Sequence, residues 1–537
     1  MFSAAKIWIG LAAGCIIIAA VLLVLSTDEM KSEQELTKEM NGELKQSNDT
    51  GGSASKVRAV PPASAVGKVP PNGNPLVSHK FGADPYALVY EDRVYLYMTN
   101  DVFEYDAAGN VKENTYGKIN KITVISSDDL VNWTDHGVID AAGPEGAAKW
   151  ATQSWAPAIV HRVIDGKDWF FLYFANNASG IGVLTSESPT GPWVDPIGKA
   201  LITRETPGVE DVTWLFDPAV LVDDDGKAYI YFGGGIPEGE HEMPGTSRVM
   251  PLGEDMISVV GEAVSIPAPY LFEDSGINKV DGKYYYTYCT NFYDGERAEG
   301  SPPPGEIAYM VSESPMGPWT YKGTILKNPI HFFGIGGNNH HVIFQFRDAW
   351  YIAYHAQTLS KAMGVPNGYR STHLNRVHFS EDGSIQEIIA DYKGVEQVKH
   401  LDPYQRVEAE TIAWSAGVKV EPLTANDADQ DHSARFIVTD IHDGDWTAVS
   451  KVDFGTGAAE FIVSVRSGEG PWSIELRLGS PEGTLIGTVN VPSAKGSLWT
   501  EVKTEVTGAS GIHDLYMVYR GENNVTGIQI DDWQFSK

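Results

Sequence analysis

The sequence has very few cysteines for its length. Among its 537 residues only Cys15 and Cys289 are cysteines, and Cys15 lies within an N-terminal apolar run. Two cysteines cannot form the disulfide framework that stabilises many small extracellular domains. Stability must therefore come from a packed core or from bound metal, and Cys289 is expected to be a buried packing residue.

Basic residues are also scarce. The chain carries 40 Lys and Arg against 71 Asp and Glu, which gives a formal net charge of −31. A nucleic-acid partner is disfavoured, because no basic surface is available to neutralise phosphates. The acidic balance suits an extracellular protein that acts on a neutral polymer.

Long amphipathic helical patterns are absent as well, whereas aromatic residues are plentiful. The chain contains 24 Tyr and 14 Trp and is 42% hydrophobic. This composition indicates a folded protein, and the length allows two or three domains. Alternating apolar and polar residues bounded by turn residues predict an all-β chain.

The N-terminus holds the one long hydrophobic run, from Ile7 to Leu25 after Lys6. Such a run is typical of a secretory signal peptide or a membrane anchor. We assign residues 1–26 to it and leave open whether cleavage follows Ser26. Residues 27–75 are rich in Lys, Glu, Ser, Gly and Pro and are predicted to be a flexible linker. The protein is therefore expected to be secreted, or held at the cell surface if the segment is uncleaved.

A strand, a tight turn and an aromatic-rich second strand recur five times between residues 76 and 400. Hairpin repeats of about 55 to 75 residues predict the blades of a five-bladed β-propeller. A propeller brings equivalent positions of all blades together at one end of its axis. The leading residues of the five copies are Asp84, Ala156, Asp217, Glu273 and His340.

Three of these leading residues carry carboxyl groups. Two carboxylic acids on opposite sides of a bond suffice for glycoside hydrolysis, because one activates water and the other protonates the leaving oxygen. A third acid nearby raises the pKa of the proton donor. Asp84 and Asp217 also precede prolines, where Asp is a common turn residue, but their shared register with Glu273 favours a catalytic role. The residues alone do not assign a role to each acid.

From residue 404 onward the pattern changes to short alternating strands, such as Phe461–Arg466 and Ile474–Leu478. About 130 residues of this kind predict a β-sandwich of the jelly-roll type at residues 404–537.

Short motifs in the repeat region resemble glycoside hydrolase family 43, whose members are inverting five-bladed propellers acting on arabinose- and xylose-containing polysaccharides. The resemblance covers residues 76–400 and rests on Gly82-Ala-Asp-Pro85, Ser154-Trp-Ala-Pro157, Phe216-Asp-Pro218, Leu271-Phe-Glu273, Asn338-Asn-His-His341 and Tyr369-Arg-Ser-Thr-His-Leu374. It implies that Asp84 is the general base, that Glu273 is the general acid, and that Asp217 orients Glu273 and modulates its pKa.

The same resemblance implies further site residues. Trp155 would line the sugar subsite, Asn338 would contact substrate, and Arg370 would anchor Asp84. His340 matches an axial histidine that often holds a hydrated calcium ion in this family, although calcium prefers oxygen ligands. Because the pair His340 and His341 departs from the usual pattern, the choice between them stays open.

The C-terminal region resembles a family 6 carbohydrate-binding module. Glu408, Glu410 and Asp531 match the ligands of a structural calcium ion in that family, and oxygen ligands suit calcium. Whether this module binds xylan, another glycan or nothing is left open.

The two resemblances together imply an exported inverting hydrolase that removes α-L-arabinofuranosyl side chains from arabinoxylan and functions as a monomer. A β-xylosidase or an endo-arabinanase on the same scaffold is the alternative within this class. A non-catalytic carbohydrate-binding surface protein is the alternative from a different class.

Overall fold

Tight hairpin turns build the first and larger part of the chain. A two-residue turn of type I′ needs positive φ at both central residues, and Glu91 and Asp92 meet this at 48° and 57°. Asp281 and Gly282 do the same at 49° and 79°. These turns fix the antiparallel register of the flanking strands, for example Tyr90 opposite Arg93.

A computed structural model describes residues 67–423, 436–467, 470–493, 499–521 and 528–537, all within one compact unit of the chain. The predicted N-terminal signal or anchor and residues 27–66 of the predicted linker lie outside these residues. Residues 67–75 were predicted to belong to the flexible linker but are packed: Lys68 forms a β-bridge with Ser415, and the buried Asn74 donates to Leu374 O at 3.1 Å. In the described ranges, no helix is long and apolar enough to cross a membrane.

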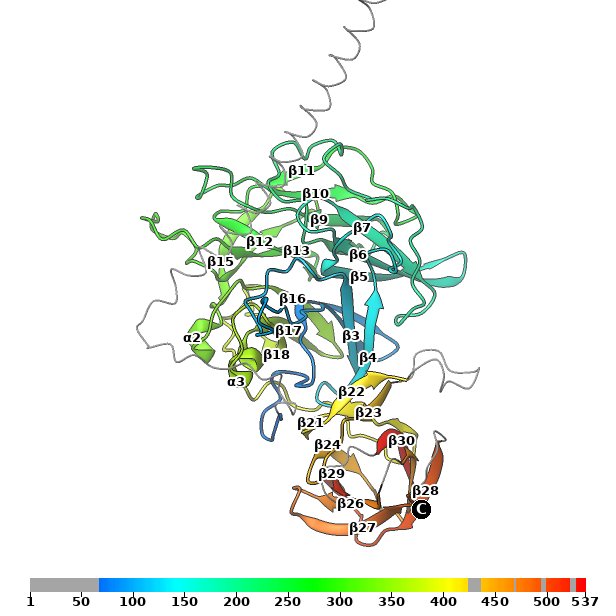
Figure 1. Ribbon diagram of the computed structural model, residues 1–537. Helices are drawn as coiled ribbons and strands as arrows, with labels where there is room; N and C mark the ends of the chain where they lie inside the picture. The colour runs from blue at the N-terminus through cyan, green and yellow to red at the C-terminus, as the bar shows by residue number, and fades with distance from the viewer. Residues whose placement is uncertain (1–66, 424–435, 468–469, 494–498, 522–527) are drawn as a thin grey trace, which may run out of the picture. The chain divides into compact units, whose positions relative to one another are not determined.

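Five antiparallel sheets follow one another in sequence order (Figure 1). The first holds β1 (Ala83–Tyr90), β2 (Arg93–Thr99), β3 (Lys121–Ser127) and β4 (Trp133–Asp140), and the second holds β5 (Trp155–Ile164), β6 (Lys167–Ala175) and β7 (Ile181–Ser186). The third holds β8 (Ala219–Val222), β9 (Ala228–Phe232), β10 (Ser247–Pro251) and β11 (Val264–Ile266). The fourth holds β12 (Leu271–Val280), β13 (Lys283–Thr290), β14 (Ile307–Ser312) and β15 (Thr320–Leu326), and the fifth holds β16 (His341–Phe346), β17 (Ala349–Ala356) and β18 (Ser371–Val377).

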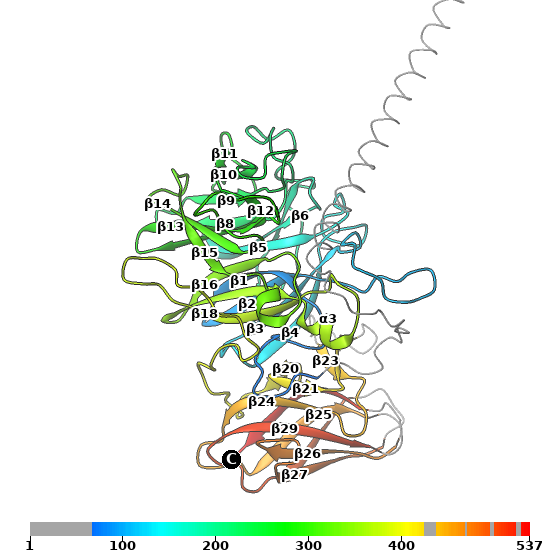
Figure 2. The ribbon, with the colours of Figure 1, turned by 90° about the vertical axis from the view of Figure 1, so that its left-hand side faces the viewer.

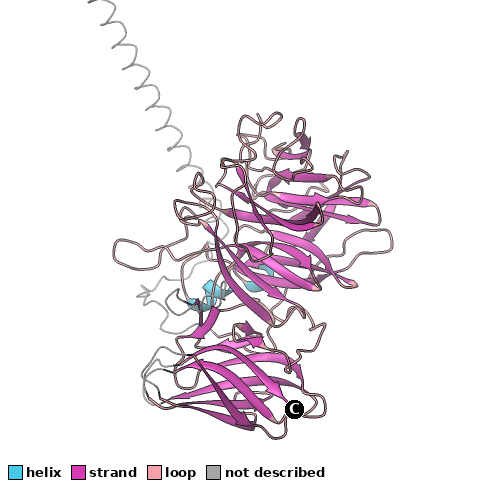
Figure 3. Ribbon diagram, turned by 90° about the vertical axis from the view of Figure 1, so that its right-hand side faces the viewer, coloured by secondary structure: helices cyan, strands magenta, loops and turns pink. Residues whose placement is uncertain are grey.

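Buried apolar clusters lie between successive sheets and close them into a ring. Tyr97 of the first sheet packs in one cluster with Leu172 of the second, and comparable clusters join the second to the third, the third to the fourth and the fourth to the fifth. A further cluster joins Phe344 of the fifth sheet to Leu96 of the first. This closed ring is the predicted five-bladed propeller. Helices α2 (Ile330–Phe333) and α3 (Thr358–Met363) are short; α2 lies in the connection from the fourth to the fifth blade and α3 in the loop between β17 and β18 (Figure 3).

The remaining strands form a two-sheet sandwich, as predicted. One sheet contains β19 (Val407–Glu408), β22 (Lys419–Pro422), β23 (Phe436–Thr439), β25 (Glu460–Arg466), β28 (Thr500–Glu505) and β30 (Gln529–Ser536). The other contains β21 (Trp414–Ala416), β24 (Trp446–Asp453), β26 (Trp472–Leu478), β27 (Thr484–Val491) and β29 (Ile512–Gly521), and Figure 2 shows β29, β26 and β27 side by side. The short strand β20 (Thr411–Ile412) instead pairs with β4 of the first blade.

Candidate active site

A bulge near the start of the first strand of several blades positions the site residues. The register of β1 shifts after Ala83, that of β5 after Trp155 and that of β12 after Glu273. The residue that follows each shift has positive φ, and these residues are Asp84 (47°), Ala156 (40°) and Asp274 (72°). Positive φ is costly for residues other than glycine and concentrates at functional sites.

One part of the sequence prediction is therefore wrong by one residue. Glu273 was expected at the register of Asp84, but Asp274 occupies that position and Glu273 precedes it, as Trp155 precedes Ala156. The eight-residue spacing from the leading residue to the turn Asp was misleading. In the first blade that Asp is Asp92, the second central residue of its turn, whereas in the fourth blade it is Asp281, the first central residue. Blade four thus contributes two adjacent carboxyl groups to the site.

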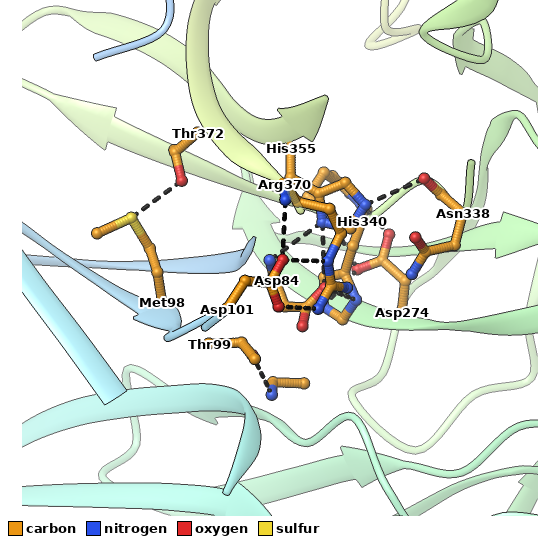
Figure 4. Close-up of polar contacts among 12 residues, drawn as sticks. Asp84, Met98, Thr99, Asp101, Asp274, Asn338, His340, His355, Arg370 and Thr372 are labelled. Atoms are coloured by element: carbon orange, nitrogen blue, oxygen red, sulfur yellow. Dashed lines mark hydrogen bonds and ion pairs between the residues drawn. The ribbon is translucent and has the colours of Figure 1, made fainter. Parts of the chain in front are cut away.

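The candidate base Asp84 is 5% exposed and surrounded by nitrogen atoms (Figure 4). Arg370 Nη1 donates a hydrogen bond of 2.8 Å to Asp84 Oδ1, and the Asp84 backbone N–H donates one of 3.1 Å to His355 Nδ1. Burial by itself would raise the pKa of Asp84, but the charge of Arg370, with smaller effects from His340 and His355, outweighs it and holds the pKa well below its usual range. Asp84 is therefore ionised at neutral pH.

The candidate acid Glu273 has the opposite environment. It is 3% exposed, and Asn338 Nδ2 donates a hydrogen bond of 2.9 Å to its Oε1. Burial is the main cause that raises the pKa of Glu273, and the negative charges of Asp84 and Asp274 raise it further against the effect of Asn338. The pKa of Asp217 is also raised, by burial and by the charges of Glu273 and Asp84. Close acids of this kind share a proton, which makes Glu273 a proton donor near neutral pH.

The structure brings the predicted substrate and positioning residues to the same place. Trp155 is half-buried and its indole N–H donates to Tyr116 O at 3.1 Å. Arg370 is 4% exposed, and its guanidinium lies 4.8 Å from the centre of the Tyr116 ring. Asn338 touches Glu273, as described above.

The two histidines lie in different surroundings. His340 Nδ1 lies 3.5 Å from Asp84 Oδ1 and 3.7 Å from Asp217 Oδ2, so His340 faces the carboxyl groups of the site. His340 Nε2 also lies 3.2 Å from Asp274 Oδ1, whereas both ring nitrogens of His341 are engaged away from Asp84 and Asp217, with Asp274 Oδ2 at 2.5 Å and Thr287 Oγ1 at 2.9 Å.

Three residues of the site escaped the sequence prediction. Asp101 accepts hydrogen bonds from Arg370 Nε (3.0 Å), Nη2 (2.9 Å) and backbone N–H (2.8 Å), and thereby fixes the guanidinium beside Asp84. His355 accepts from Asp84, and its Nε2–H donates to Asn338 O at 3.0 Å. Asp274 follows Glu273 directly in the sequence, but no motif singled it out. Asp101 and His355 lie near strand ends that are distant from Asp84 and Arg370 in the sequence.

In the C-terminal sandwich, Glu410 is 4% exposed and its Oε2 has no hydrogen-bond partner among the described residues. Asp531 is 1% exposed, and its backbone O accepts from the Ala409 N–H at 2.9 Å, which places the two predicted ligands close together. Burial, reinforced by the charges of Glu408 and Asp531, raises the pKa of Glu410 to about 9. Arg406 lies 3.2 Å from Glu408 Oε2.

Cys289 is fully buried, as predicted. It lies opposite Glu273 in the β12–β13 register and has no solvent access. It therefore packs beneath the site.

Comparison with known proteins agrees with this geometry. Residues 73–385 match the family "Glycosyl hydrolases family 43", and residues 408–537 match "Carbohydrate binding module (family 6)". The chain is 53% identical over 484 residues to an arabinoxylan arabinofuranohydrolase of Paenibacillus polymyxa, covering 88% of this chain and 75% of that protein. It is 51% identical over 481 residues to one of Bacillus subtilis (strain 168), covering 87% and 93%.

A solved structure is similar over the same range. The crystal structure of a family 43 arabinoxylan arabinofuranohydrolase from Bacillus subtilis, in complex with cellotetraose, superposes with a TM-score of 0.85 at 51% identity. The match covers 88% of this chain and 99% of that one. The chain therefore belongs to glycoside hydrolase family 43 and carries a family 6 carbohydrate-binding module at its C-terminal end.

Proposed function

We propose that this protein removes α-L-arabinofuranosyl side chains from arabinoxylan by inverting hydrolysis. The observation that carries the proposal is the pair of acids held in opposite states, Asp84 ionised beside Arg370 and Glu273 protonated in a buried, acidic environment. The names of the two relatives that exceed 50% identity support arabinose as the sugar released.

Each acid has one task in this reaction. Asp84 takes a proton from a water molecule as the water oxygen forms a bond with the anomeric carbon of arabinose. The bond between that carbon and the xylan oxygen breaks, and Glu273 transfers its proton to the departing oxygen. Asp217 keeps Glu273 protonated beforehand, while Arg370 keeps Asp84 ionised. Trp155 and Asn338 contact the sugar.

The alternatives predict different products. A relative from Humicola insolens, 30% identical over 360 residues, is named xylosidase/arabinosidase, so the same scaffold accommodates xylose in that protein. A β-xylosidase would release xylose, and an endo-arabinanase would release arabino-oligosaccharides. A non-catalytic binding protein would release nothing, which the paired states of Asp84 and Glu273 disfavour.

Chromatography of the products from arabinoxylan, linear arabinan and xylo-oligosaccharides separates these cases. Arabinose released from arabinoxylan, with the xylan chain left intact, supports the proposal. Xylose or arabino-oligosaccharides as main products would replace it by the corresponding alternative. No product from any of the three would favour the binding protein.

Calcium is proposed as a structural ion of the C-terminal module. The fit rests on Glu410, whose carboxyl group has an oxygen without a hydrogen-bond partner among the described residues. Burial and then the charges of nearby acids raise its pKa, and a bound cation would relieve this arrangement. Glu408 and Asp531 are the further ligands that we propose. Among the described residues, no three acidic, His or Cys side chains are grouped closely enough to hold a metal ion, so backbone oxygens or water would complete the shell.

We extend the calcium proposal to a hydrated ion at His340. Nδ1 of His340 faces Asp84 and Asp217, and its Nε2 lies 3.2 Å from Asp274 Oδ1, so this position attracts positive charge. Burial lowers the pKa of His340, which favours the neutral ring that a metal ion needs. Water would supply most of the ligands.

We propose further that the protein acts outside the cell as a monomer. The proposal rests on the apolar run at residues 7–25 and on the acidic composition. Mass spectrometry of the mature protein would show whether residues 1–26 are removed, and light scattering would give its oligomeric state.

A further inference from the structure

Loops at the active-site end of the propeller carry an aromatic pair beside the acid. The site residues lie at the start of the first strand of each blade, so the loop from the second to the third strand is at the same end. In blades three and four these loops are residues 233–246 and 291–306. His241 of the first loop and Tyr293 of the second stack with ring centres 4.4 Å apart and planes at 13°.

Both loops begin next to Glu273. The Gly235 N–H donates a hydrogen bond of 2.8 Å to the carbonyl of Phe272, which precedes Glu273. Cys289, the register partner of Glu273, lies two residues before Asn291 at the start of the second loop. Both loops therefore start beside the strand that carries Glu273.

Hydrogen bonds hold the pair in place. Asn291 Nδ2 donates to His241 O at 2.8 Å and so joins the two loops. Arg297 Nη2 donates to Asn291 O and to Tyr293 O, both at 2.9 Å, and its guanidinium lies 4.1 Å from the centre of the Tyr270 ring. These contacts fix the loops before any ligand binds, which reduces the entropy cost of binding.

The surface of this region is partly apolar and open. His241 and Tyr293 are half-buried, and Met243 on the same loop as His241 is 49% exposed. Flat aromatic rings with exposed apolar area suit the apolar face of a sugar ring. The opposite loop in blade one, residues 100–120, carries Tyr105 at 47% exposure but starts on the Asp84 side of the site.

We propose that the stacked pair of His241 and Tyr293 binds the xylose unit of the leaving xylan chain and makes the enzyme select branched polymer over small arabinosides. The inference rests on the proposed function. A general acid must lie beside the oxygen that it protonates, so the leaving group occupies the Glu273 side of the site. The pair belongs to the two loops that start on that side, and it acts on specificity rather than on bond cleavage.

The test compares arabinoxylan with methyl α-L-arabinofuranoside, which has the same sugar and an alcohol leaving group but lacks the xylose unit. Y293A is expected to lower kcat/KM on arabinoxylan about tenfold, mainly through KM, because one sugar–aromatic contact is lost. Its kcat/KM on the methyl glycoside is expected to stay at the parent value. Y293F should match the parent on both substrates, and H241A should behave like Y293A.

The exposed Tyr105 supplies the control, since Y105A removes an even more exposed ring on the other side of the site and should not alter the ratio between the two substrates. Two results would overturn the proposal. One is an equal loss of kcat/KM on both substrates in Y293A. The other is an unchanged kcat/KM on arabinoxylan in a Y293A protein that unfolds at the parent temperature. If the parent releases a sugar other than arabinose, the proposed function is wrong. The pair of His241 and Tyr293 is then tested in the same way, by comparing a polymer that carries the released sugar with the methyl glycoside of that sugar.

Discussion

The backbone N–H of Asp274 donates a hydrogen bond of 2.9 Å to Asp217 Oδ2. This bond joins the residue that follows the acid Glu273 to the carboxyl group of Asp217, whose pKa is raised by burial and by the charge of Glu273. The bulge that gives Asp274 its positive φ therefore also brings the backbone of blade four into contact with the Asp217 carboxyl group. The backbone of blade four is part of the mechanism that tunes the acid.

Replacing Asp217 by asparagine tests this tuning. Asp217 and Glu273 share a proton in the parent, and removing it places two negative charges side by side, whereas a neutral amide at position 217 imposes no such repulsion on Glu273. The pKa of Glu273 therefore falls in D217N, and the alkaline limb of the kcat/KM profile, where the acid deprotonates, moves to lower pH. The measurement is kcat/KM against pH for both proteins. An alkaline limb at the same pH would contradict the role of Asp217.

Removing the proton donor should stop the reaction on natural leaving groups. E273Q keeps the size of the side chain and is expected to reduce kcat on arabinoxylan by a factor of about 10²–10⁴, since the departing xylan oxygen no longer receives a proton. A substrate with an acidic phenol as leaving group needs no such proton and should lose much less. Unfolding temperature and sugar affinity should stay near those of the parent. Parent-like turnover of arabinoxylan by E273Q would refute the assignment of the acid.

Asp101 is predicted to matter for both stability and activity. In D101N an amide NH₂ faces the guanidinium of Arg370, and breaking a buried ion pair costs about 3–5 kcal/mol in the free energy of unfolding. Arg370 then no longer holds Asp84, so kcat/KM also falls. Urea unfolding and kcat/KM measured on the same protein check both effects.

The ion pair between Asp92 and Arg347 provides the control for D101N. It is exposed, with 2.9 Å between Arg347 Nη2 and Asp92 Oδ2, and exposed pairs contribute about 0–1 kcal/mol. The free energy of unfolding and the kcat/KM of D92N should therefore stay close to the parent values. Equal effects of D92N and D101N would show that burial of the Asp101 pair has no special role.

Calcium should stabilise the C-terminal module in a pH-dependent way. The pKa of Glu410 is raised to about 9, so without metal this group is protonated in the folded state but ionised in the unfolded state between about pH 4.3 and pH 9. That difference lowers stability progressively as pH rises through this window, because the unfolded state binds fewer protons. A bound calcium ion displaces the proton and removes the penalty.

The measurement is the unfolding temperature with calcium and with a chelator at pH 5.5 and pH 8. The gain from calcium should be larger at pH 8, and E410Q should lose most of it. Equal unfolding temperatures with and without calcium at both pH values would exclude the proposed structural ion.

The sequence was sufficient to predict the blades, because hairpin turns and alternating strands are local patterns. Glu91 and Asp92 adopt the turn geometry that their position predicts, and Asp84, Asp217 and Glu273 converge as the repeat implied. A bulge is not visible in residue spacing, so the one-residue shift between Glu273 and Asp274 could not be predicted. Nor could the partners of Arg370 and Asp84, since Asp101 and His355 reach them only through the closed ring.

The most direct test of the account is proton NMR of arabinoxylan hydrolysis by the protein lacking residues 1–26, recorded from the first minutes. Water attack on the face opposite the leaving xylan oxygen should release β-arabinofuranose first from the α-linked side chains, before its anomers equilibrate. This result would establish both the inverting use of Asp84 and Glu273 and the removal of side chains. Initial release of the α-anomer would contradict the inverting mechanism, and release of xylose would contradict the proposed substrate.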